Sequence, residues 1–412
     1  MDKQDAEQAS FEDTCHFIIK LGLAAHNYGS TSPALEAYLS RLTATLGYSG
    51  TFISTPNAVV FAFQESEGQW QQLHLVTKPS TGSNLDKLAQ VGDIVDSIEA
   101  GEISVSDASV RLDEIAKTPL PWGKIANLLS YAFCGCGLAI LFGGGWIDAL
   151  VATLFSVIVY GMVLFAGRQD ARMADWLPLY SAFAVAVLAT IMKIGIPELN
   201  IVTVILASIV VLLPGYTVSL GVIELVSQNV VSGTTNLMNG LVYLVKQFLG
   251  GWLGVGLVSA LLTNPTAAAG TPVNSAWLWL FMPLVFIALA VIFQTTRRDF
   301  IWVFIGCAAA YSGMMFGSTL ANANLGNLLG TIFTVIFANL WAIWTNRPAT
   351  IVLLPAIIVL VSGSIGFRGL VSITEGQTAV GVQQFLQMFI VALTIAAGLL
   401  VGNTIVRPKV TL

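Results

Sequence analysis

Two hydrophobic patterns divide the chain near residue 122. Before that point, apolar positions recur at helix or strand spacing among charged residues. After it, apolar runs follow one another at the length of about 20 residues that crosses a bilayer. These runs predict ten spans, at 125–142, 146–166, 176–194, 199–219, 237–262, 276–294, 300–318, 325–345, 349–367 and 384–405. We therefore expect a polytopic α-helical membrane protein with about ten transmembrane helices and a small N-terminal soluble domain.

The first 122 residues predict an α+β domain. Apolar spacing and turn residues indicate helices, three antiparallel strands and two further helices, in the order 11–26, 34–46, 51–54, 58–63, 71–76, 84–99 and 104–116. Ser32 precedes Pro33 and is expected to cap the second helix. Asn84 and Ser104 or Ser106 are expected to cap the last two helices.

The distribution of charge changes at the same boundary. The chain is 55% hydrophobic and 10% charged, against about 25% charged in soluble domains. Residues 1–124 have a net charge of −8 and residues 125–412 a net charge of +3. No basic or apolar leader opens the sequence, so we expect the acidic domain to remain in the cytoplasm.

Basic residues near the spans predict the orientation, because cytoplasmic loops are enriched in Lys and Arg. With the N-terminus inside, only Lys193 and Arg368 lie outside. The inside residues are Lys117, Lys124, Arg168, Arg172, Arg297, Arg298, Arg347, Arg407 and Lys409. Both termini are then cytoplasmic in an inner-membrane, multi-pass protein, which requires an even number of spans.

The two halves of the membrane region resemble each other weakly. Leu213-Pro214-Gly215 followed by Glu224 aligns with Val361-Ser362-Gly363 followed by Ser372, at an offset of 148 residues. The predicted units are 123–266 and 267–412, with five spans each. An odd number of spans inverts the second unit relative to the first, which is typical of secondary transporters.

Polar residues interrupt the apolar pattern in corresponding places of the two units, 214–236 and 362–384. Backbone broken at membrane depth must be covered by protein or line a wet cavity. Freed amides there suit a carboxylate, and amide or hydroxyl side chains suit its polar groups. The candidates are Pro214, Gly215, Glu224, Asn236, Ser362, Gly363 and Arg368. Ordinary polar loops are the alternative interpretation.

Isolated charges in the spans are a second set of candidates, since a charge in lipid is costly. Glu224 is the candidate for proton coupling. Asp148 either couples ions or caps a helix after a glycine-rich turn. Lys246 either lies on the pathway or extends its ammonium group to the membrane surface.

One cluster in the N-terminal domain has two interpretations. His26, Tyr28, Gly29 and Glu36 surround a turn that leads into a helix. A helix N-terminus favours anions, so the cluster is either a ligand or gating site, or a turn with its capping residues.

Other chemistry finds no support in the sequence. It has no GxxxxGK[ST] phosphate loop, so uphill transport would draw on an ion gradient. The four cysteines lack the spacing of a zinc site, and we expect no metal, cofactor or nucleic acid. The expected partners are a small amino acid or carboxylate, protons and lipid, with a homo-oligomer as a further possibility.

The sequence resembles the threonine/serine exporter family over nearly its whole length. The matching stretches are 21–63, 85–115 ending in RLDEIA, FGGGWIDA at 142–149, LLPG at 212–215, and 346–370. The family tends to have Pro-Gly where this chain has Ser362-Gly363. The resemblance implies export of L-threonine and L-serine driven by the proton motive force, by antiport. A related branch implies dicarboxylate export instead. A membrane-tethered enzyme or sensor is a third hypothesis.

Overall fold

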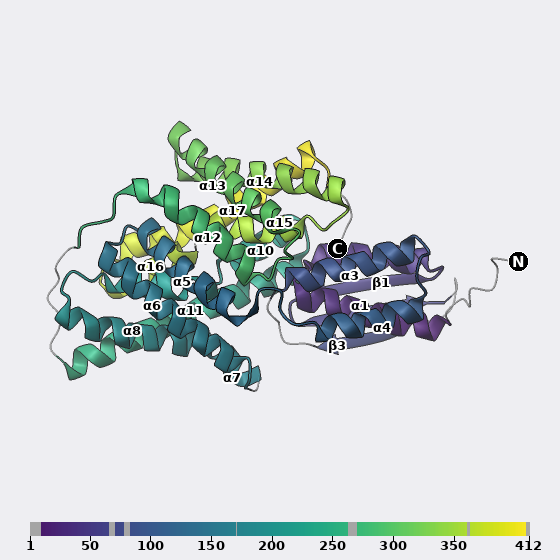
Figure 1. Ribbon diagram of the computed structural model, residues 1–412, viewed down its shortest axis with the longest axis horizontal. Coiled ribbons are helices and arrows are strands. Elements are labelled where there is room, and N and C mark those ends of the chain that lie inside the picture. The colour runs from purple at the N-terminus through teal and green to yellow at the C-terminus, as the bar shows by residue number, and fades with distance from the viewer. Residues whose placement is uncertain are drawn as a thin grey trace, which may run out of the picture.

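The computed structural model describes residues 10–65, 71–77, 83–169, 171–262, 270–360 and 363–408. Figure 1 shows an N-terminal domain at one end of the long axis and a larger bundle of helices beside it. We call the end of the bundle that contacts this domain the proximal end, and the opposite end the distal end.

The N-terminal domain is a three-stranded antiparallel sheet with helices packed on it. The strand order is β1-β2-β3, and the turn at Pro56-Asn57 joins the first two strands as predicted. Its elements are α1 (Phe11–Tyr28), α2 (Ser32–Thr45), β1 (Ser49–Thr55), β2 (Ala58–Gln64), β3 (Gln72–Thr77), α3 (Leu85–Glu99) and α4 (Val105–Lys117). The small N-terminal sheet is therefore confirmed.

Alternation along the strands positions the core of this domain. Phe52, Phe61 and Phe63 are buried with Leu21 and Leu39 of the helices. Successive strand residues point to opposite faces of a sheet, so every second position meets the helices. One face of the sheet is therefore covered by helices.

The predicted helix caps are confirmed in two cases and wrong in one. The side chains of Asn84 and Ser104 accept hydrogen bonds from the amides of Lys87 and Asp107. Ser32 is the first residue of α2 and not its cap, because Thr31 takes the extended capping position without a side-chain bond. The Ser32 hydroxyl is thereby free to bond elsewhere.

The remainder of the chain is helical. Among the described residues, nine helices are long and apolar enough to cross a membrane, and one bent pair makes a tenth if it counts as one span. The elements are α5 (Gly123–Leu141), α6 (Trp146–Ala166), α7 (Ala171–Asp175), α8 (Leu177–Gly195), α9 (Ile201–Ile209), η1 (Val210–Leu212), α10 (Gly215–Val226), α11 (Val230–Leu261), η2 (Ser275–Trp277), α12 (Leu278–Ile292), α13 (Phe300–Leu320), α14 (Ala323–Thr345), α15 (Thr350–Leu360), α16 (Gly363–Thr374) and α17 (Thr378–Ile405).

The polar stretch 214–236 begins at a break in the backbone, as one interpretation predicted, and continues as a helical hairpin and not as a loop. α10 and α11 are joined by a turn at 227–229, and α16 and α17 are joined in the same way after Thr374. Ser232 and Asn236 of α11 bond to Glu224 of α10 across the hairpin, which is how polar side chains join helices in lipid. Spans five and ten accordingly begin earlier than predicted, at Val230 and Thr378.

Glycines explain how closely the hairpin helices pack. A Cβ atom on Gly221 would lie 2.6 Å from the Leu237 amide nitrogen, and one on Gly233 would lie 2.7 Å from the Leu225 amide nitrogen. No larger side chain fits at such distances. The backbones of α10 and α11 therefore meet directly.

The N-terminal domain docks on the proximal end through backbone bonds and charges. The amides of Leu85 and Asp86 donate to the carbonyls of Phe293 and Gln294, at 3.0 and 2.9 Å. These bonds join the amides at the start of α3 to the carbonyls at the end of α12. Both sets of groups lack a partner within their own helix.

Three side chains add to this docking. Arg347 pairs with Asp299 within the bundle and lies 3.6 Å from the Asp93 carboxylate of α3. Asn346 donates to Asp96 at 2.6 Å. The domain is thus held to the bundle at the loops that follow α12 and α14.

Candidate functional site

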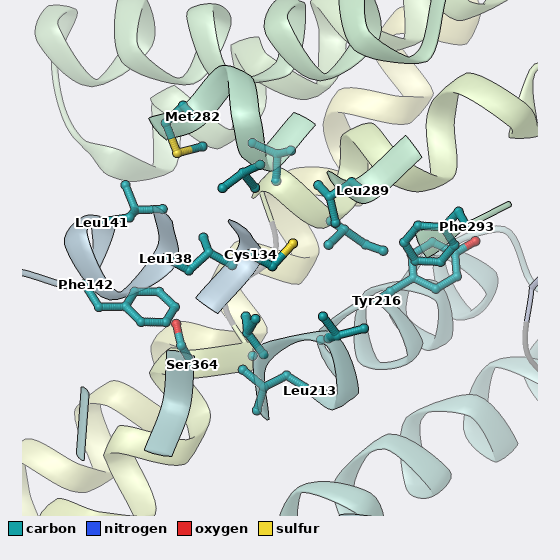
Figure 2. Close-up of a pocket in the computed structure, with 17 residues that line it drawn as sticks. Cys134, Leu138, Leu141, Phe142, Leu213, Tyr216, Met282, Leu289, Phe293 and Ser364 are labelled. Carbon is teal, nitrogen blue, oxygen red and sulfur yellow. The ribbon is translucent and has the colours of Figure 1, made fainter. Parts of the chain in front are cut away.

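A cavity of about 100 Å³ lies inside the bundle, between helices of its first and second halves. Figure 2 shows Phe142 and Ser364 at one end of it, Tyr216 and Phe293 at the other, and Cys134 between them. The lining residues are Cys134, Leu138, Leu141, Phe142, Val210, Val211, Leu213, Gly215, Tyr216, Met282, Val285, Leu289, Phe293, Ile358, Val359, Gly363 and Ser364. Sites for drug-sized ligands measure about 300–1,000 Å³, so this volume suits a much smaller solute.

A bend in the backbone forms one wall of the cavity. Ile201–Leu212 and Gly215–Val226 meet at 59°. Pro214 has no N–H and cannot continue the helical ladder, so the chain bends there. The first helical bond of α10 runs from the Val218 amide to the Pro214 carbonyl. The amides of residues 215–217 therefore have no acceptor within the helix. The predicted candidates Pro214 and Gly215 therefore lie at the cavity.

Gln247 braces this bend, and the sequence reading did not single it out. Its side chain is fully buried, and Nε2 donates to the Leu212 carbonyl at 2.8 Å. That carbonyl would otherwise bond to an amide one turn further along a continuous helix. A glutamine inside an apolar helix was the available signal, since buried amides need partners.

The second half meets this bend at Gly363. A Cβ atom on Gly363 would lie 3.1 Å from the Gly215 Cα atom, so the two backbones nearly touch. By length and composition, Thr350–Thr374 is one candidate membrane span. The predicted candidate Ser362 lies outside the described residues.

The proximal wall of the cavity adjoins the N-terminal domain. Tyr216, Phe293 and Ile358 line the cavity and pack against a hydrophobic cluster that joins the core of that domain to the bundle. Leu354 of α15 is itself a buried member of that cluster.

Arg368 covers the distal wall. Its guanidinium lies 5.1 Å from the centre of the Phe142 ring, and Nη2 lies 3.3 Å from the Phe142 carbonyl oxygen. The interaction of a cation with an aromatic face is worth about 0.5–2 kcal/mol. Arg368 therefore holds a cavity-lining ring from the outer side.

Glu224 and Asn236, which the sequence analysis proposed together, are in contact. Asn236 donates to Oε2 of Glu224 at 2.7 Å and Ser232 donates to the same oxygen at 2.8 Å. Glu224 is 1% exposed, and its Oε1 makes no hydrogen bond within the described residues. A buried carboxylate without a cationic partner is a candidate for proton uptake.

The chain of bonds continues into the N-terminal domain. The hydroxyl of Ser32, at the start of α2, lies 2.9 Å from the hydroxyl of Ser232. The backbone amide of Ser32 also interacts with the Glu224 carboxylate. The predicted N-terminal and membrane candidates therefore meet at one place.

The remaining candidates of the N-terminal domain lie around this contact. Glu36 of α2 interacts electrostatically with Glu224, and its Oε1 accepts a bond from the Ser54 amide at 2.6 Å. Burial raises the pKa of Glu36, and that bond partly offsets the rise. Burial lowers the pKa of His26, whose Nδ1 lies 3.4 Å from the Ser54 hydroxyl.

Tyr28 and Gly29 form the turn before α2. Gly29 has a φ of 107°, which favours glycine, and it ends α1. The Tyr28 carbonyl accepts a bond from the Asn84 amide at 3.0 Å. These two residues thus shape the turn that presents Ser32 to the bundle.

Asp148 and Lys246 are not brought to the cavity. Asp148 accepts bonds from the amides of Gly145 and Asn200, at 2.8 and 2.7 Å, and so caps α6 and ties it to α9. The Lys246 ammonium group donates to the Asp175 carbonyl and lies over the Trp176 ring. The Asp148 contacts match the alternative of a helix cap, whereas Lys246 lies within α11, which begins at Val230.

Metal-ligand chemistry has no candidate in the part of the chain that the structure describes. No group of three or more His, Cys, Asp or Glu side chains there is placed to hold a metal ion. The four cysteines are free, and Cys134 is the one that lines the cavity.

Two family models match the chain. The first, described as a putative threonine/serine exporter, matches residues 16–258, and the second, described as Threonine/Serine exporter, ThrE, matches residues 278–405. The chain belongs to the threonine/serine exporter family. The first model spans the N-terminal domain and the helices up to α11, and the second spans α12 to α17. The bend and the Glu224 cluster are thus parts of a ThrE-family membrane transporter.

The relatives of this chain include fungal proteins. An uncharacterized protein of Schizosaccharomyces pombe is 25% identical over 86% of this chain and 48% of its own length. Pheromone-regulated membrane protein 10 is 25% identical in Pichia sorbitophila and 27% identical in Saccharomyces cerevisiae, over 85% of this ThrE-family chain. Those matches cover 36% and 46% of the two fungal proteins, so this chain spans less than half of each relative. No solved structure matches it significantly.

Proposed function

We propose that this protein is a secondary active exporter of small amino acids, with L-threonine and L-serine as substrates. It exchanges them for protons across the cytoplasmic (inner) membrane, with both termini in the cytoplasm. The substrate occupies the cavity at the bend between α9 and α10. Membership of an exporter family supports transport, and the site supports the substrate class.

The observation on which this proposal rests is that the bend presents two opposite helix ends to the cavity. Carbonyls at the end of α9 and η1 carry partial negative charge, and amides at the start of α10 carry partial positive charge. Val210, Val211 and Gly215 line the cavity at these ends. A zwitterion matches both, with its ammonium group on the carbonyls and its carboxylate on the amides. The hydroxyls of Tyr216 and Ser364 are suited to a hydroxylated side chain.

A mirrored arrangement of the two halves supports alternating access. The glycine contacts of α10/α11 recur in α16/α17 at positions 148 residues later. A Cβ atom on Gly369 would lie 2.9 Å from the Phe385 amide nitrogen, as one on Gly221 would lie 2.6 Å from that of Leu237. The Gly363 and Gly215 contact joins equivalent positions as well. We propose two five-helix units in inverted orientation, with the substrate between them.

Glu224 is the proposed proton carrier. It lies on α10, two turns beyond Tyr216, and the two side chains interact electrostatically. Loading of the cavity and protonation of Glu224 therefore act on the same short helix. If α10 moves only when either the cavity holds substrate or Glu224 holds a proton, the protein can export substrate against its concentration gradient.

A dicarboxylate is the second candidate substrate, and one observation favours it. The residues that line the cavity include no Asp or Glu side chain to pair with an ammonium group. An acid without an amine would need only the amides of α10. The two candidate substrates differ in whether a substrate ammonium group binds the carbonyls at the end of η1.

Transport by purified protein in proteoliposomes tests the proposal. Labelled L-threonine, L-serine and succinate are compared with and without a pH gradient. We expect the gradient to accelerate threonine and serine transport, whereas succinate acceleration alone would favour the second candidate. Transport of none of the three would contradict the proposed function.

The Glu224→Gln variant tests coupling. We expect it to retain exchange of internal for external threonine and to lose acceleration by the pH gradient. Glu375→Gln is the matched control, because Glu375 is exposed after α16 in the second hairpin. Unchanged gradient-driven transport in Glu224→Gln would show that another group carries the proton.

A further inference from the structure

The contact between the N-terminal domain and the first hairpin lies where a solute would leave the cavity toward the proximal end. Tyr216, Phe293 and Ile358 form the cavity wall there and pack against the cluster that contains the core of the domain and Leu354 of α15. The Phe293 carbonyl also accepts a bond from the Leu85 amide of the domain at 3.0 Å. A solute that moved from the cavity to this end would have to displace these side chains toward the domain.

The start of α2 fastens the domain at the same place. Ser32 bonds to Ser232, Ser232 bonds to Glu224, and all three side chains are buried. α2 has no side-chain cap of its own, and its Ser32 amide interacts with the Glu224 carboxylate across the interface. A carboxylate at a helix N-terminus is stabilising.

The other attachments of the domain lie on different elements. The start of α3 bonds to the end of α12, and Asp93 and Asp96 of α3 contact the residues after α14. Trp122 of the segment that enters α5 donates to the Thr295 carbonyl at 2.6 Å. Separation at Ser32 and Ser232 therefore leaves the α3 side attached, so the domain can swing without detaching.

We propose that the N-terminal domain is the proximal gate of the transport route, closed by the contact of Ser32 with Ser232 and Glu224 and by its packing behind Tyr216 and Phe293. The gate opens when the start of α2 leaves the first hairpin. This inference rests on the proposed transport function. It adds that the domain must separate from the bundle in every transport cycle.

A reversible cross-link tests the gate. Ser32→Cys and Ser232→Cys are combined in a background without Cys15, Cys134, Cys136 and Cys307. The hydroxyls are 2.9 Å apart, so the two sulfur atoms lie within reach of a disulfide. Copper phenanthroline is the oxidant, and the yield is read on gels of protein in proteoliposomes. We expect a high yield, at least a tenfold loss of threonine transport, and recovery after dithiothreitol.

The matched control is a pair of serines at the same spacing inside the N-terminal domain. The hydroxyls of Ser104 and Ser106 are 2.8 Å apart. We expect oxidation of the Ser104→Cys/Ser106→Cys variant to leave transport unchanged. Full cross-linking of residues 32 and 232 with unchanged transport would overturn the gate, and so would failure of that pair to cross-link. Absence of threonine and serine transport by the protein with its native serines and cysteines would instead contradict the proposed function.

A second measurement avoids any dependence on the double variant. The single Ser232→Cys variant is labelled with a membrane-permeant maleimide in the same background. Ser232 is fully buried when the domain is docked, so labelling requires the gate to open. We expect threonine with a pH gradient to raise the labelling rate severalfold. An equal rate at rest and during transport would contradict the proposal.

Discussion

The two hairpins of the bundle share a packing scheme and differ in their chemistry. In α10/α11 and in α16/α17, glycines at equivalent positions bring the helix backbones into contact. In the first hairpin, Asn236 donates to a buried carboxylate at 2.7 Å. In the second, Ser372 and Gln384 occupy the equivalent positions, 3.4 Å apart and without a charge.

The two hairpins also contact different parts of the molecule. The first hairpin bonds to the N-terminal domain through Ser232, whereas the second hairpin has Arg368 on the distal wall of the cavity. The shared glycines explain a common shape, and the unshared polar residues explain why only one hairpin would bind a proton. Similar helical frames can thus hold one chemical site and one structural copy of it.

The largest effect is expected from the shared glycines. Gly221→Val and Gly369→Val each place side-chain atoms within about 3 Å of backbone in the facing helix. Overpacking of this kind costs about 1–3 kcal/mol or more. We expect both variants to lose threonine transport and to melt at lower temperature, measured in proteoliposomes and in detergent. Gly161→Val, where a Cβ atom meets nothing within 4 Å, is the control.

The next effect separates the two hairpins. Asn236→Leu removes a charge-assisted bond to Glu224, which is worth about 1.5–3 kcal/mol. Gln384→Leu removes only a long contact between neutral groups. We expect gradient-driven transport to fall about tenfold or more in the first variant and less than twofold in the second. Equal losses would mean that the two hairpins are functionally alike.

A smaller effect is expected at the distal wall. Arg368→Gln removes the cation from the Phe142 ring, and such contacts are worth about 0.5–2 kcal/mol. We expect a severalfold change in the transport rate with a raised leak of threonine in the absence of a gradient. Arg297→Gln is the control, because Arg297 lies over Trp122 at 5.9 Å and away from the cavity. An unchanged leak in Arg368→Gln would remove this residue from the distal wall.

The smallest effect concerns the domain that docks on the first hairpin. Burial lowers the pKa of His26 in the folded protein below its ordinary value of 6.5. The unfolded domain therefore binds more protons just below pH 6.5, so the stability of the domain falls as pH drops through that value. Hydrogen exchange of β1 in the full chain, corrected for intrinsic rates, should show weaker protection at pH 5.5 than at pH 7.5. In His26→Gln this difference should shrink, and an unchanged difference would assign it to another group.

The sequence predicted the membrane helices and the N-terminal sheet because both follow from short-range patterns. Apolar runs gave the spans, and alternation with the Pro56-Asn57 turn gave β1 and β2. The hairpin within 214–236 was not predicted, because side chains such as Ser232 and Asn236 resemble loop residues until their partner Glu224 is placed beside them. That partner comes from a neighbouring helix, which a local pattern does not specify.

The candidate site was predicted only where local sequence patterns indicate its residues. Pro214, Gly215, Glu224 and Asn236 follow from local breaks in hydrophobicity. Gln247 does not, because its role depends on a carbonyl 35 residues earlier in the chain. The contact of Ser32 with Ser232 joins residues 200 positions apart, and no sequence spacing indicates it.

The central claim is that substrate occupies the cavity at the bend, and Cys134 tests it most directly because this native thiol lines the cavity. A protein whose only cysteine is Cys134 is treated with a small methanethiosulfonate in proteoliposomes, beside a protein that retains only Cys136. Cys136 does not line the cavity. The account predicts that modification of Cys134 stops transport and that threonine or serine slows it severalfold, without protecting Cys136. Equal modification of Cys134 with and without a substrate that the protein still transports would contradict the account.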